Sequence, residues 1–148
     1  MNQELQNKLV EKYPEFFEYL KDHKGPLVPI VFGFECGDGW YVILDALMAE
    51  IKNHLENKNR NDKDSKVPHT LEILQIKEKY GGLCFYVGGA DSETYGMIRL
   101  AESLSYKICE LCGSTKDVGI TQGWNITCCK KCFDGEKTNM KEWTPNND

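Results

Sequence analysis

Four cysteines in residues 109–132 have the type and the spacing of a metal site. They form the pairs Cys109-x-x-Cys112 and Cys129-x-x-Cys132, which are separated by 16 residues. A two-residue gap lets both thiolates of a pair reach one tetrahedral ion at about 2.3 Å. Four protein ligands leave no open coordination position, so the pattern predicts a structural Zn²⁺ site and not a catalytic one.

Other interpretations of the cysteines stay open. Cys128 directly precedes Cys129 and could replace it as the third ligand. Paired cysteines can also be reduced, buried hydrophobic residues, or a redox dithiol, although nothing thioredoxin-like precedes either pair. The isolated Cys36 and Cys84 are expected to be small core or near-surface residues. The histidines stand in no recognisable motif and are expected to be solvent-exposed or structural; they are His23, His54 and His69.

A second group of residues, in and around the stretch 75–86, could bind a polar ligand. Its lysines and the backbone N–H groups of a diglycine turn suit a phosphate or a carboxylate. Its aromatic side chains could stack on a base. The stretch is equally explained as a hairpin with a charged outer face. The candidate ligand-binding residues are Asp38, Trp40, Lys77, Lys79, Tyr80, Tyr86, Arg99 and Glu102.

The elements that must position these residues begin with helical segments. Residues 3–21 predict two helical pieces with a bend at Pro14, because a mid-helix proline would break the run. Residues 27–34 are apolar and β-prone, but Pro29 makes them an edge strand or an extended connection. Asp38 is a candidate N-cap for an amphipathic helix that runs to Leu55. Residues 57–66 carry no apolar side chain and predict a loop.

The apolar period then changes from helical to alternating. Residues 70–87 predict a β-hairpin, with Leu74 and Ile76 on one face and Leu71 and Ile73 on the other. A helix follows, capped by Asp91 or Ser92, with its buried stripe ending at Ile108. The predicted fold class is therefore α+β, in which helices pack on a small antiparallel sheet.

The cysteine pairs divide the chain into three predicted parts. Residues 1–108 form the α+β body, 109–133 a zinc-ribbon-like module with β-prone runs at 118–120 and 124–127, and 134–148 a flexible tail unless Trp143 docks. Because the module has few apolar residues, metal should hold it folded. Zinc removal is expected to unfold it and to leave the body largely folded.

Composition narrows the classes of protein further. The 148 residues carry a formal charge of −5, and no segment is strongly basic, which makes generic nucleic-acid binding unlikely. Four thiolates with one Zn²⁺ add −2 and deepen the charge to about −7. No apolar run is long enough for a membrane span, and the first residues do not resemble a signal peptide. A cytoplasmic location without membrane contact is expected.

Four segments together resemble a family of small proteins encoded by phages and prophages. They are Gly-Asp-Gly-Trp at 37–40, Gln-x-Lys-Glu-Lys-Tyr-Gly-Gly-Leu at 75–83, Phe-Tyr at 85–86 and Cys-Glu-x-Cys-Gly at 109–113. The resemblance covers residues 30–133, and the family has no assigned activity. The family usually has Arg at the position of Cys84, so the resemblance does not support anion binding at this position. Membership implies expression in a bacterial host and an accessory, non-structural role.

Three functions follow as hypotheses. The first is binding without turnover, as in anti-defence proteins that sequester an anionic nucleotide-like signalling molecule in a pocket of a homo-oligomer, or that block a host defence protein. The second is a zinc-ribbon nucleic-acid or transcription accessory factor. The third is a nucleotide hydrolase that uses Asp38, Glu102 and lysines, although these residues have no recognised catalytic spacing. The first hypothesis predicts that the chain is not an enzyme.

Overall fold

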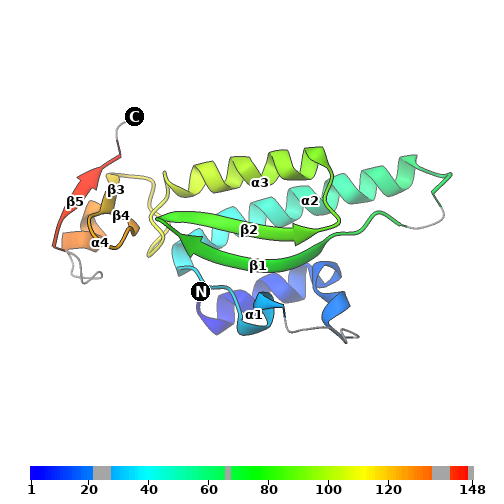
Figure 1. Cartoon of the computed structure of the whole chain (residues 1–148), viewed down its shortest axis with the longest axis horizontal. Coiled ribbons are helices and arrows are strands. Elements are labelled where there is room, and N and C mark those ends of the chain that lie inside the picture. The colour runs from blue at the N-terminus through cyan, green and yellow to red at the C-terminus, as the bar shows by residue number, and fades with distance from the viewer. Residues whose placement is uncertain (22–27, 66–67, 135–140, 147–148) are drawn as a thin grey trace.

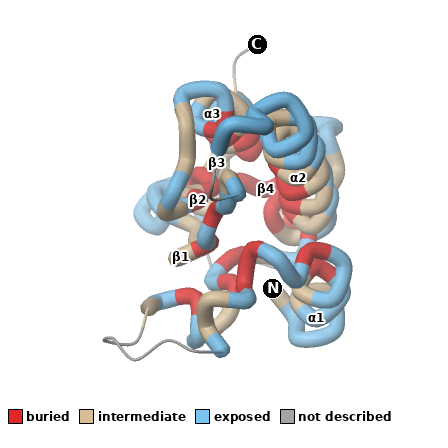
Figure 2. The backbone as a smooth tube through the Cα atoms, turned by 90° about the vertical axis from the view of Figure 1, so that its right-hand side faces the viewer, coloured by how far each residue is buried: buried red, intermediate tan, exposed pale blue. Residues whose placement is uncertain are grey.

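The structure is a computed structural model that describes residues 1–21, 28–65, 68–134 and 141–146. A β-hairpin lies at the centre of the body, and a small cysteine-bearing module lies at one end of it (Figure 1). Seen along the long axis, the hairpin and three helices surround a common core, with buried positions facing inward (Figure 2). Helices with small antiparallel sheets confirm the predicted α+β class.

The N-terminal segment is helical in pieces, as predicted. Helix α1 spans Gln3–Lys12 and is capped by Asn2, whose side chain accepts the Leu5 N–H. The chain then bends into the 3₁₀ helices η1 (Pro14–Phe16) and η2 (Glu18–Lys21), with Pro14 at the first helical position. His23 lies outside the described residues.

The segment before the main helix differs from its prediction. In place of a strand or an extended connection, Pro29–Phe32 forms the 3₁₀ helix η3, because the fixed φ of Pro29 suits a first helical position. Glu35 forms one parallel bridge to Lys77 of the hairpin. Asp38 belongs to η4 (Asp38–Trp40) and does not cap the following helix. Its carboxylate instead accepts the backbone and side-chain N–H groups of Asn2, at 2.6 and 2.7 Å.

Helix α2 spans Tyr41–Asn61 and is longer than predicted. It continues through the first five residues of the expected loop, because Asn, Lys and Arg are tolerated in a solvent-exposed helix. Beside this last turn, the Asn59 side chain bonds both the N–H and the carbonyl oxygen of His69, at 2.6 and 3.0 Å. An absence of apolar residues here marks a largely exposed last part of the helix, in which Lys58 is half-buried, and not the end of the helix.

The hairpin consists of β1 (Glu72–Lys79) and β2 (Gly82–Gly88) and confirms the prediction. Its two-face assignment was wrong, because the register shifts by one residue between Ile73 and Gln75. A bulged residue reverses the alternation of side chains. Ile73 and Ile76 are consequently both buried, although they were predicted on opposite faces.

Both edges of this two-stranded sheet have hydrogen-bond partners. Along β2, the N–H groups of Leu83 and Phe85 donate to the Ser105 hydroxyl and the Glu102 carboxylate, at 2.9 and 3.0 Å. Along β1, the bonds are Glu35 N–H to Ile76 O at 2.9 Å, Glu78 N–H to Glu35 O at 2.8 Å, and Tyr19 Oη to Ile73 O at 2.8 Å.

Helix α3 spans Ser92–Ser105, and of the two predicted caps the structure uses Asp91, which accepts the Thr94 N–H at 2.9 Å. The module that follows contains β3 (Val118–Thr121), β4 (Thr127–Cys129), the short helix α4 (Lys130–Asp134) and β5 (Trp143–Pro145). These strands form one antiparallel sheet in the order β4-β3-β5.

The tail differs from a flexible segment where the structure describes it. Strand β5 pairs with β3, and the Trp143 indole N–H donates to the Cys128 carbonyl oxygen at 3.0 Å. Its ring also stacks on Phe133, with 6.4 Å between centroids. Docking of Trp143, the exception that the sequence allowed, therefore orders this part of the tail.

Candidate metal centre and adjoining cleft

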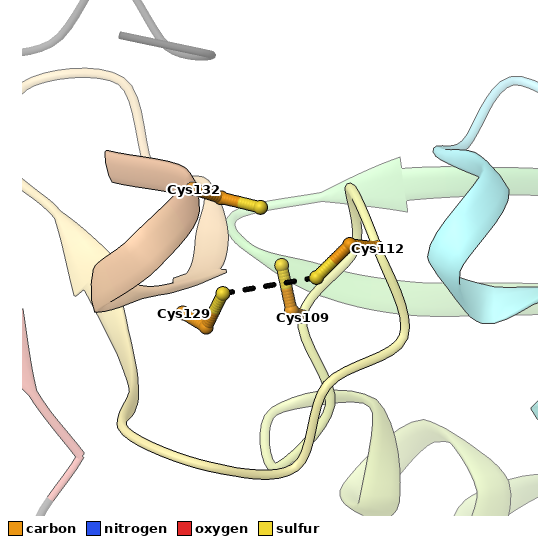
Figure 3. A group of neighbouring side chains, drawn as sticks. All are labelled: Cys109, Cys112, Cys129 and Cys132. Carbon is orange, nitrogen blue, oxygen red and sulfur yellow. Dashed lines mark hydrogen bonds between the residues drawn. The ribbon is translucent and has the colours of Figure 1, made fainter. Parts of the chain in front are cut away.

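The four predicted cysteine ligands come together at one point (Figure 3). Cys109 and Cys112 follow α3, Cys129 ends β4 and Cys132 lies in α4. Their Sγ atoms all lie within 4.8 Å of one another, and the Cys112 and Cys129 sulfurs are 3.7 Å apart. Four sulfurs around a tetrahedral ion at 2.3 Å would be about 3.8 Å apart, so the group could hold a metal ion.

Cys129, and not Cys128, belongs to this group. Successive side chains of a strand point to opposite faces, so only one of two neighbours in β4 can face the other sulfurs. Cys128 is fully buried on the other face, where burial raises the pKa of its thiol to about 11. The spacing left Cys128 and Cys129 open, and this alternation places Cys129 in the group that could hold a metal ion.

The chain around Cys112 favours its thiolate. Burial raises the pKa of this thiol, but hydrogen bonds from the Ser114 N–H and from the neighbouring thiols outweigh burial and bring it to about 7. The turn itself is closed by a bond from the Gly113 N–H to the Cys109 carbonyl oxygen at 2.8 Å. Metal binding requires thiolates, and four sulfur donors suit a soft ion.

The Gly-Asp-Gly-Trp segment, residues 37–40, packs against the backbone of the first cysteine pair. The Gly37 N–H donates to the Glu110 carboxylate at 2.8 Å, and the Gly39 N–H donates to the Glu110 carbonyl oxygen at 2.7 Å. A Cβ atom at Gly39 would lie 2.2 Å from the Cys109 carbonyl oxygen. Only glycine lets the two backbones approach this closely.

The segment 37–40 contains two residues that were predicted to bind a ligand, and both have structural contacts instead. Trp40 is fully buried, and its indole N–H donates to the Ile108 carbonyl oxygen at 3.0 Å. It offers no stacking face, so that prediction was wrong: the ring anchors the chain just before Cys109. Asp38 is exposed but bonded to Asn2, and it does not line the cleft described below.

Glu110 is a structural residue that the sequence did not single out. It is buried, and burial raises the pKa of its carboxyl group above the usual value. Besides the bonds from Gly37 and Gly39, its own N–H donates to the Thr127 carbonyl oxygen at 2.9 Å. Glu110 thus joins body and module, a role that Cys-Glu-x-Cys spacing alone does not reveal.

The hairpin tip and the module enclose a cleft of about 400 Å³. It is lined by Lys77, Glu78, Lys79, Tyr80, Gly123, Trp124 and Asn125. The tip is held in place by the Thr127 hydroxyl, which donates to the Gly81 carbonyl oxygen at 2.5 Å. Three of the predicted ligand-binding residues, Lys77, Lys79 and Tyr80, therefore lie together at the end of β1 and in the turn, beside the loop 123–125 of the module.

The cleft combines cations with exposed aromatic rings. Tyr80 is 73% exposed and Trp124 is 68% exposed. The Lys79 ammonium lies 5.3 Å from the centre of the Tyr80 ring, and the Lys77 ammonium lies 5.2 Å from the Tyr86 ring. The Glu78 carboxylate accepts the Gly81 N–H at 2.6 Å and supports the turn. The cleft lining thus carries two ammonium groups against one carboxylate, together with two exposed aromatic rings.

The remaining predicted ligand residues lie elsewhere. Tyr86 is on the outer face of β2. The Lys77 ammonium lies over the Tyr86 ring, but Tyr86 does not line the cleft. Glu102 accepts the Phe85 N–H and closes the sheet edge. Arg99 is exposed on α3, outside the cleft lining. The sequence missed Trp124, for which the only signal was an aromatic residue next to the turn-forming Gly123.

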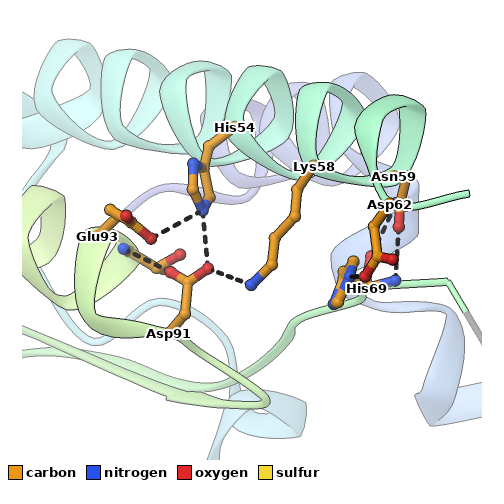
Figure 4. Close-up of polar contacts among 8 residues, drawn as sticks. His54, Lys58, Asn59, Asp62, His69, Asp91 and Glu93 are labelled. Atoms are coloured by element: carbon orange, nitrogen blue, oxygen red, sulfur yellow. Dashed lines mark hydrogen bonds and ion pairs between the residues drawn. The ribbon is translucent and has the colours of Figure 1, made fainter. Parts of the chain in front are cut away.

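Two histidines, one on α2 and one close to its end, pair with carboxylates (Figure 4). His54 Nε2 lies 2.8 Å from an Asp91 carboxylate oxygen, and the Lys58 ammonium lies 2.7 Å from the same oxygen. Although this histidine, Asp91 and Glu93 lie close enough to surround a cation, the lysine already neutralises the carboxylate. His69 likewise pairs with Asp62 at 2.8 Å. Both histidines have structural partners, one of the expected outcomes.

No helix in the described parts of the chain is long and apolar enough to cross a membrane. Comparisons of the chain with models of protein families, with curated proteins and with solved structures found no significant match, so the site rests on its own geometry and the phage-family resemblance stays a prediction.

Proposed function

We propose that this chain is a binding protein without turnover, which holds an anionic nucleotide-like ligand in the cleft between the hairpin tip and the cysteine module. The observation that carries this proposal is the meeting of Lys77 and Lys79 with the exposed rings of Tyr80 and Trp124. Ammonium groups bind phosphate as point charges, and aromatic rings stack on bases at about 1–3 kcal/mol per base.

The backbone of Tyr80 supports a binding role. Its φ is +55°, a left-handed conformation that costs a residue with a side chain about 1–2 kcal/mol. Asn or Gly would fit this turn position better. A bulky ring kept both strained and 73% exposed is explained by contact with a ligand.

We further propose that the four-cysteine group binds structural Zn²⁺. Two Cys-x-x-Cys pairs are the usual ligand set of such sites, and here the four sulfurs lie within 4.8 Å of one another. With all four positions filled by sulfur, zinc would not activate water. It would fix β4 and α4, and with them the loop that carries Trp124.

The biological role follows from the family resemblance and is part of the proposal. In the cytoplasm of a bacterial host, a phage accessory protein with this cleft would sequester a nucleotide-like signalling molecule of the host defence. Blocking of a host defence protein is the competing role. It predicts that a host protein, and no small molecule, is retained by the same cleft.

The test is ligand binding by the zinc-loaded full chain to a panel of mononucleotides and cyclic oligonucleotides, measured by calorimetry and by thermal stabilisation. A true ligand raises the unfolding temperature and is recovered intact. Lys77→Ala with Lys79→Ala, and Trp124→Ala alone, should each weaken binding at least about tenfold.

Matched controls are Lys63→Ala and Tyr95→Ala, which remove an exposed lysine and an exposed tyrosine outside the cleft lining. Both should leave the affinity unchanged. Equal loss in the control and cleft variants, or conversion of the ligand into products, would overturn the proposal.

A second candidate function, binding of single-stranded nucleic acid, is favoured by one observation. Trp124 is an exposed ring near the turn of a ribbon hairpin, and such rings also stack on unpaired bases. Affinity for a strand would fall steeply with salt and grow with strand length. A hydrolase is not proposed, because Asp38 and Glu102 are each engaged in structural hydrogen bonds.

A further inference from the structure

The cleft at the hairpin tip is lined by positive and negative side chains from opposite faces of one strand. Lys77, Glu78 and Lys79 follow one another in β1, and successive side chains of a strand point to opposite faces. Both ammonium groups therefore belong to one face, and the Glu78 carboxylate belongs to the other. All three residues nevertheless line the cleft. A bound molecule thus meets cations on one side of the strand and a carboxylate on the other.

The carboxylate side of the cleft is fixed by the hairpin turn. One oxygen of Glu78 accepts the Gly81 N–H at 2.6 Å, and among the described residues the other oxygen has no hydrogen-bond partner. An ionised carboxylate is an acceptor only. The second oxygen therefore attracts an N–H donor and repels a phosphate or a carbonyl oxygen, and such repulsion discriminates between ligands as well as attraction does.

Asn125 supplies a second polar group on the same side. Its Cβ atom lies 3.6 Å from the point where a side chain of Gly81 would begin, so Asn125 and Glu78 are both next to this glycine. Asn125 is half-buried, and no group in the described parts of the chain hydrogen-bonds its side-chain amide. The amide can therefore offer a ligand one donor and one acceptor together.

The loop that carries Asn125 is held in place by a buried threonine. The Thr121 hydroxyl donates to the Trp124 carbonyl oxygen at 2.6 Å and accepts the Ile126 N–H at 2.9 Å. Thr121 is fully buried, and its own N–H donates to the Ile126 carbonyl oxygen at 3.1 Å. Trp124 and Asn125 are consequently positioned before a ligand arrives, which lowers the cost of ordering them on binding.

We infer that the ligand of this cleft is an adenine nucleotide, which rests on the proposed binding function and specifies it. With the phosphate at the lysines and the base on the Trp124 ring, the edge of the base faces Asn125 and Glu78. The Asn amide pairs with adenine N6 and N7, and the free Glu78 oxygen accepts the second N–H of the amino group. Guanine and hypoxanthine carry an oxygen in place of this amino group, and the carboxylate repels it.

The test compares AMP with IMP by calorimetry on the zinc-loaded full chain. Both carry the same phosphate and a purine ring, and they differ in an amino group against an oxygen at C6. Stacking and phosphate binding therefore largely cancel from the ratio of the two affinities. AMP should bind about tenfold to 100-fold more tightly than IMP, and GMP should bind as weakly as IMP.

Two variants separate the roles of the polar residues. Glu78→Gln keeps an acceptor for the Gly81 N–H but turns a donor toward the base, so it should lower the AMP-to-IMP ratio at least about tenfold. Asn125→Ala should weaken AMP binding at least about fivefold. The matched controls are Glu11→Gln and Asn53→Ala, at exposed positions outside the cleft lining, and both should keep the wild-type affinities.

All variants should keep the circular dichroism and the metal content of the wild type. Equal affinities for AMP and IMP, tighter binding of GMP, or an unchanged ratio in Glu78→Gln would overturn the adenine assignment and leave the proposed binding function intact. Binding of nucleotides without adenine alone would do the same. If no nucleotide of the panel binds, the proposed function fails together with the assignment.

Discussion

Cys128 and Cys129 are adjacent and chemically identical, yet only Cys129 faces the other three sulfurs. We expect Cys129→Ser to abolish stoichiometric zinc binding. Cys128→Ser should retain one zinc per chain and lower stability by about 1–3 kcal/mol, because it buries a hydroxyl group at a fully buried position. Metal analysis by mass spectrometry under native conditions distinguishes the two, with the half-buried Cys84→Ser as control. Equal metal loss in both variants contradicts the assignment.

The absence of a side chain at Gly39 allows the backbone of the first cysteine pair to pack against the body. A methyl group there would lie 2.2 Å from the Cys109 carbonyl oxygen and 2.4 Å from the Gly113 nitrogen, both backbone atoms that cannot rotate away. Gly39→Ala should therefore destabilise the zinc-loaded chain by about 3 kcal/mol or more in urea unfolding. Gly88→Ala is the control, since its Cβ would make only ordinary contacts, the nearest at 3.5 Å.

Asp91 combines a helix cap with two cationic partners. Burial opposes ionisation, but hydrogen bonds from His54, Lys58 and the Thr94 N–H outweigh it and hold the pKa of Asp91 well below its usual value. The resulting stabilisation is complete above the unfolded pKa of about 3.9 and is lost as the pH falls through the lower folded pKa.

Two substitutions at this position separate the cap from the charge. Asp91→Ala should cost about 1–2 kcal/mol at neutral pH, and Asp91→Asn should cost less, because Asn still caps α3. The difference between wild type and Asp91→Asn should shrink below about pH 4. Urea unfolding of the wild type and of Asp91→Asn at several pH values measures this difference in stability. Loss of metal in acid should affect both proteins equally and therefore cancel from the difference. A difference that stays constant with pH would contradict the ionic role.

The hairpin turn is an element in which stability and binding conflict. Tyr80 and Gly81 both have positive φ, at +55° and +83°, as a two-residue type I′ turn requires. Tyr80→Asn should raise the free energy of unfolding by a few tenths to about 1 kcal/mol, after loss of the Lys79–Tyr80 contact. The same change should weaken ligand binding in calorimetry. A less stable variant with unchanged affinity would contradict both expectations.

The elements could be predicted where periodicity was unbroken, and local geometry explains the exceptions. The existence of helix α3 and of the hairpin follows from their apolar spacing, although α3 ends at Ser105, before Ile108 where its predicted stripe ends. The bulge at Leu74 could not be predicted, because a single extra residue leaves the composition of a strand unchanged while it reverses its faces. Residues 27–34 were predicted as an edge strand or an extended connection because proline is excluded from central strands. The fixed φ of Pro29 also suits the first position of a 3₁₀ helix, which is what forms.

Of the candidate sites, the cysteine group could be predicted from the sequence and the cleft could not, again because of local and non-local geometry. Cysteine spacing is a local signal, so the group of four cysteines that could hold a metal ion could be predicted. The cleft requires Lys77 and Tyr80 to meet Trp124, and that meeting depends on how the module docks on the hairpin tip. Trp40 was wrongly included in the site. As an aromatic residue beside a turn it was predicted to stack on a ligand, but its ring is buried in the core.

Body and module are joined more closely than their separate cores suggest. Glu110 bonds the segment 37–39, Trp40 bonds the residue before Cys109, and Thr127 bonds the hairpin tip. The sequence predicted that the body stays largely folded without zinc, but these contacts predict that zinc removal unfolds the module and also loosens the body. With Trp124 and Trp143 replaced by Phe, chelation should shift the emission of Trp40 to longer wavelength. An unshifted emission after complete metal removal would show that the body is independent.

The two-stranded sheet of the body also has a consequence for the behaviour of the whole molecule in a crowded solution. A hairpin has two open edges, and open edges recruit strands from other chains into aggregates. Here α3 side chains satisfy the N–H groups of Leu83 and Phe85, and Glu35 closes part of the other edge. These hydrogen bonds thus cover part of both edges of the two-stranded sheet and hinder their pairing with strands of other chains.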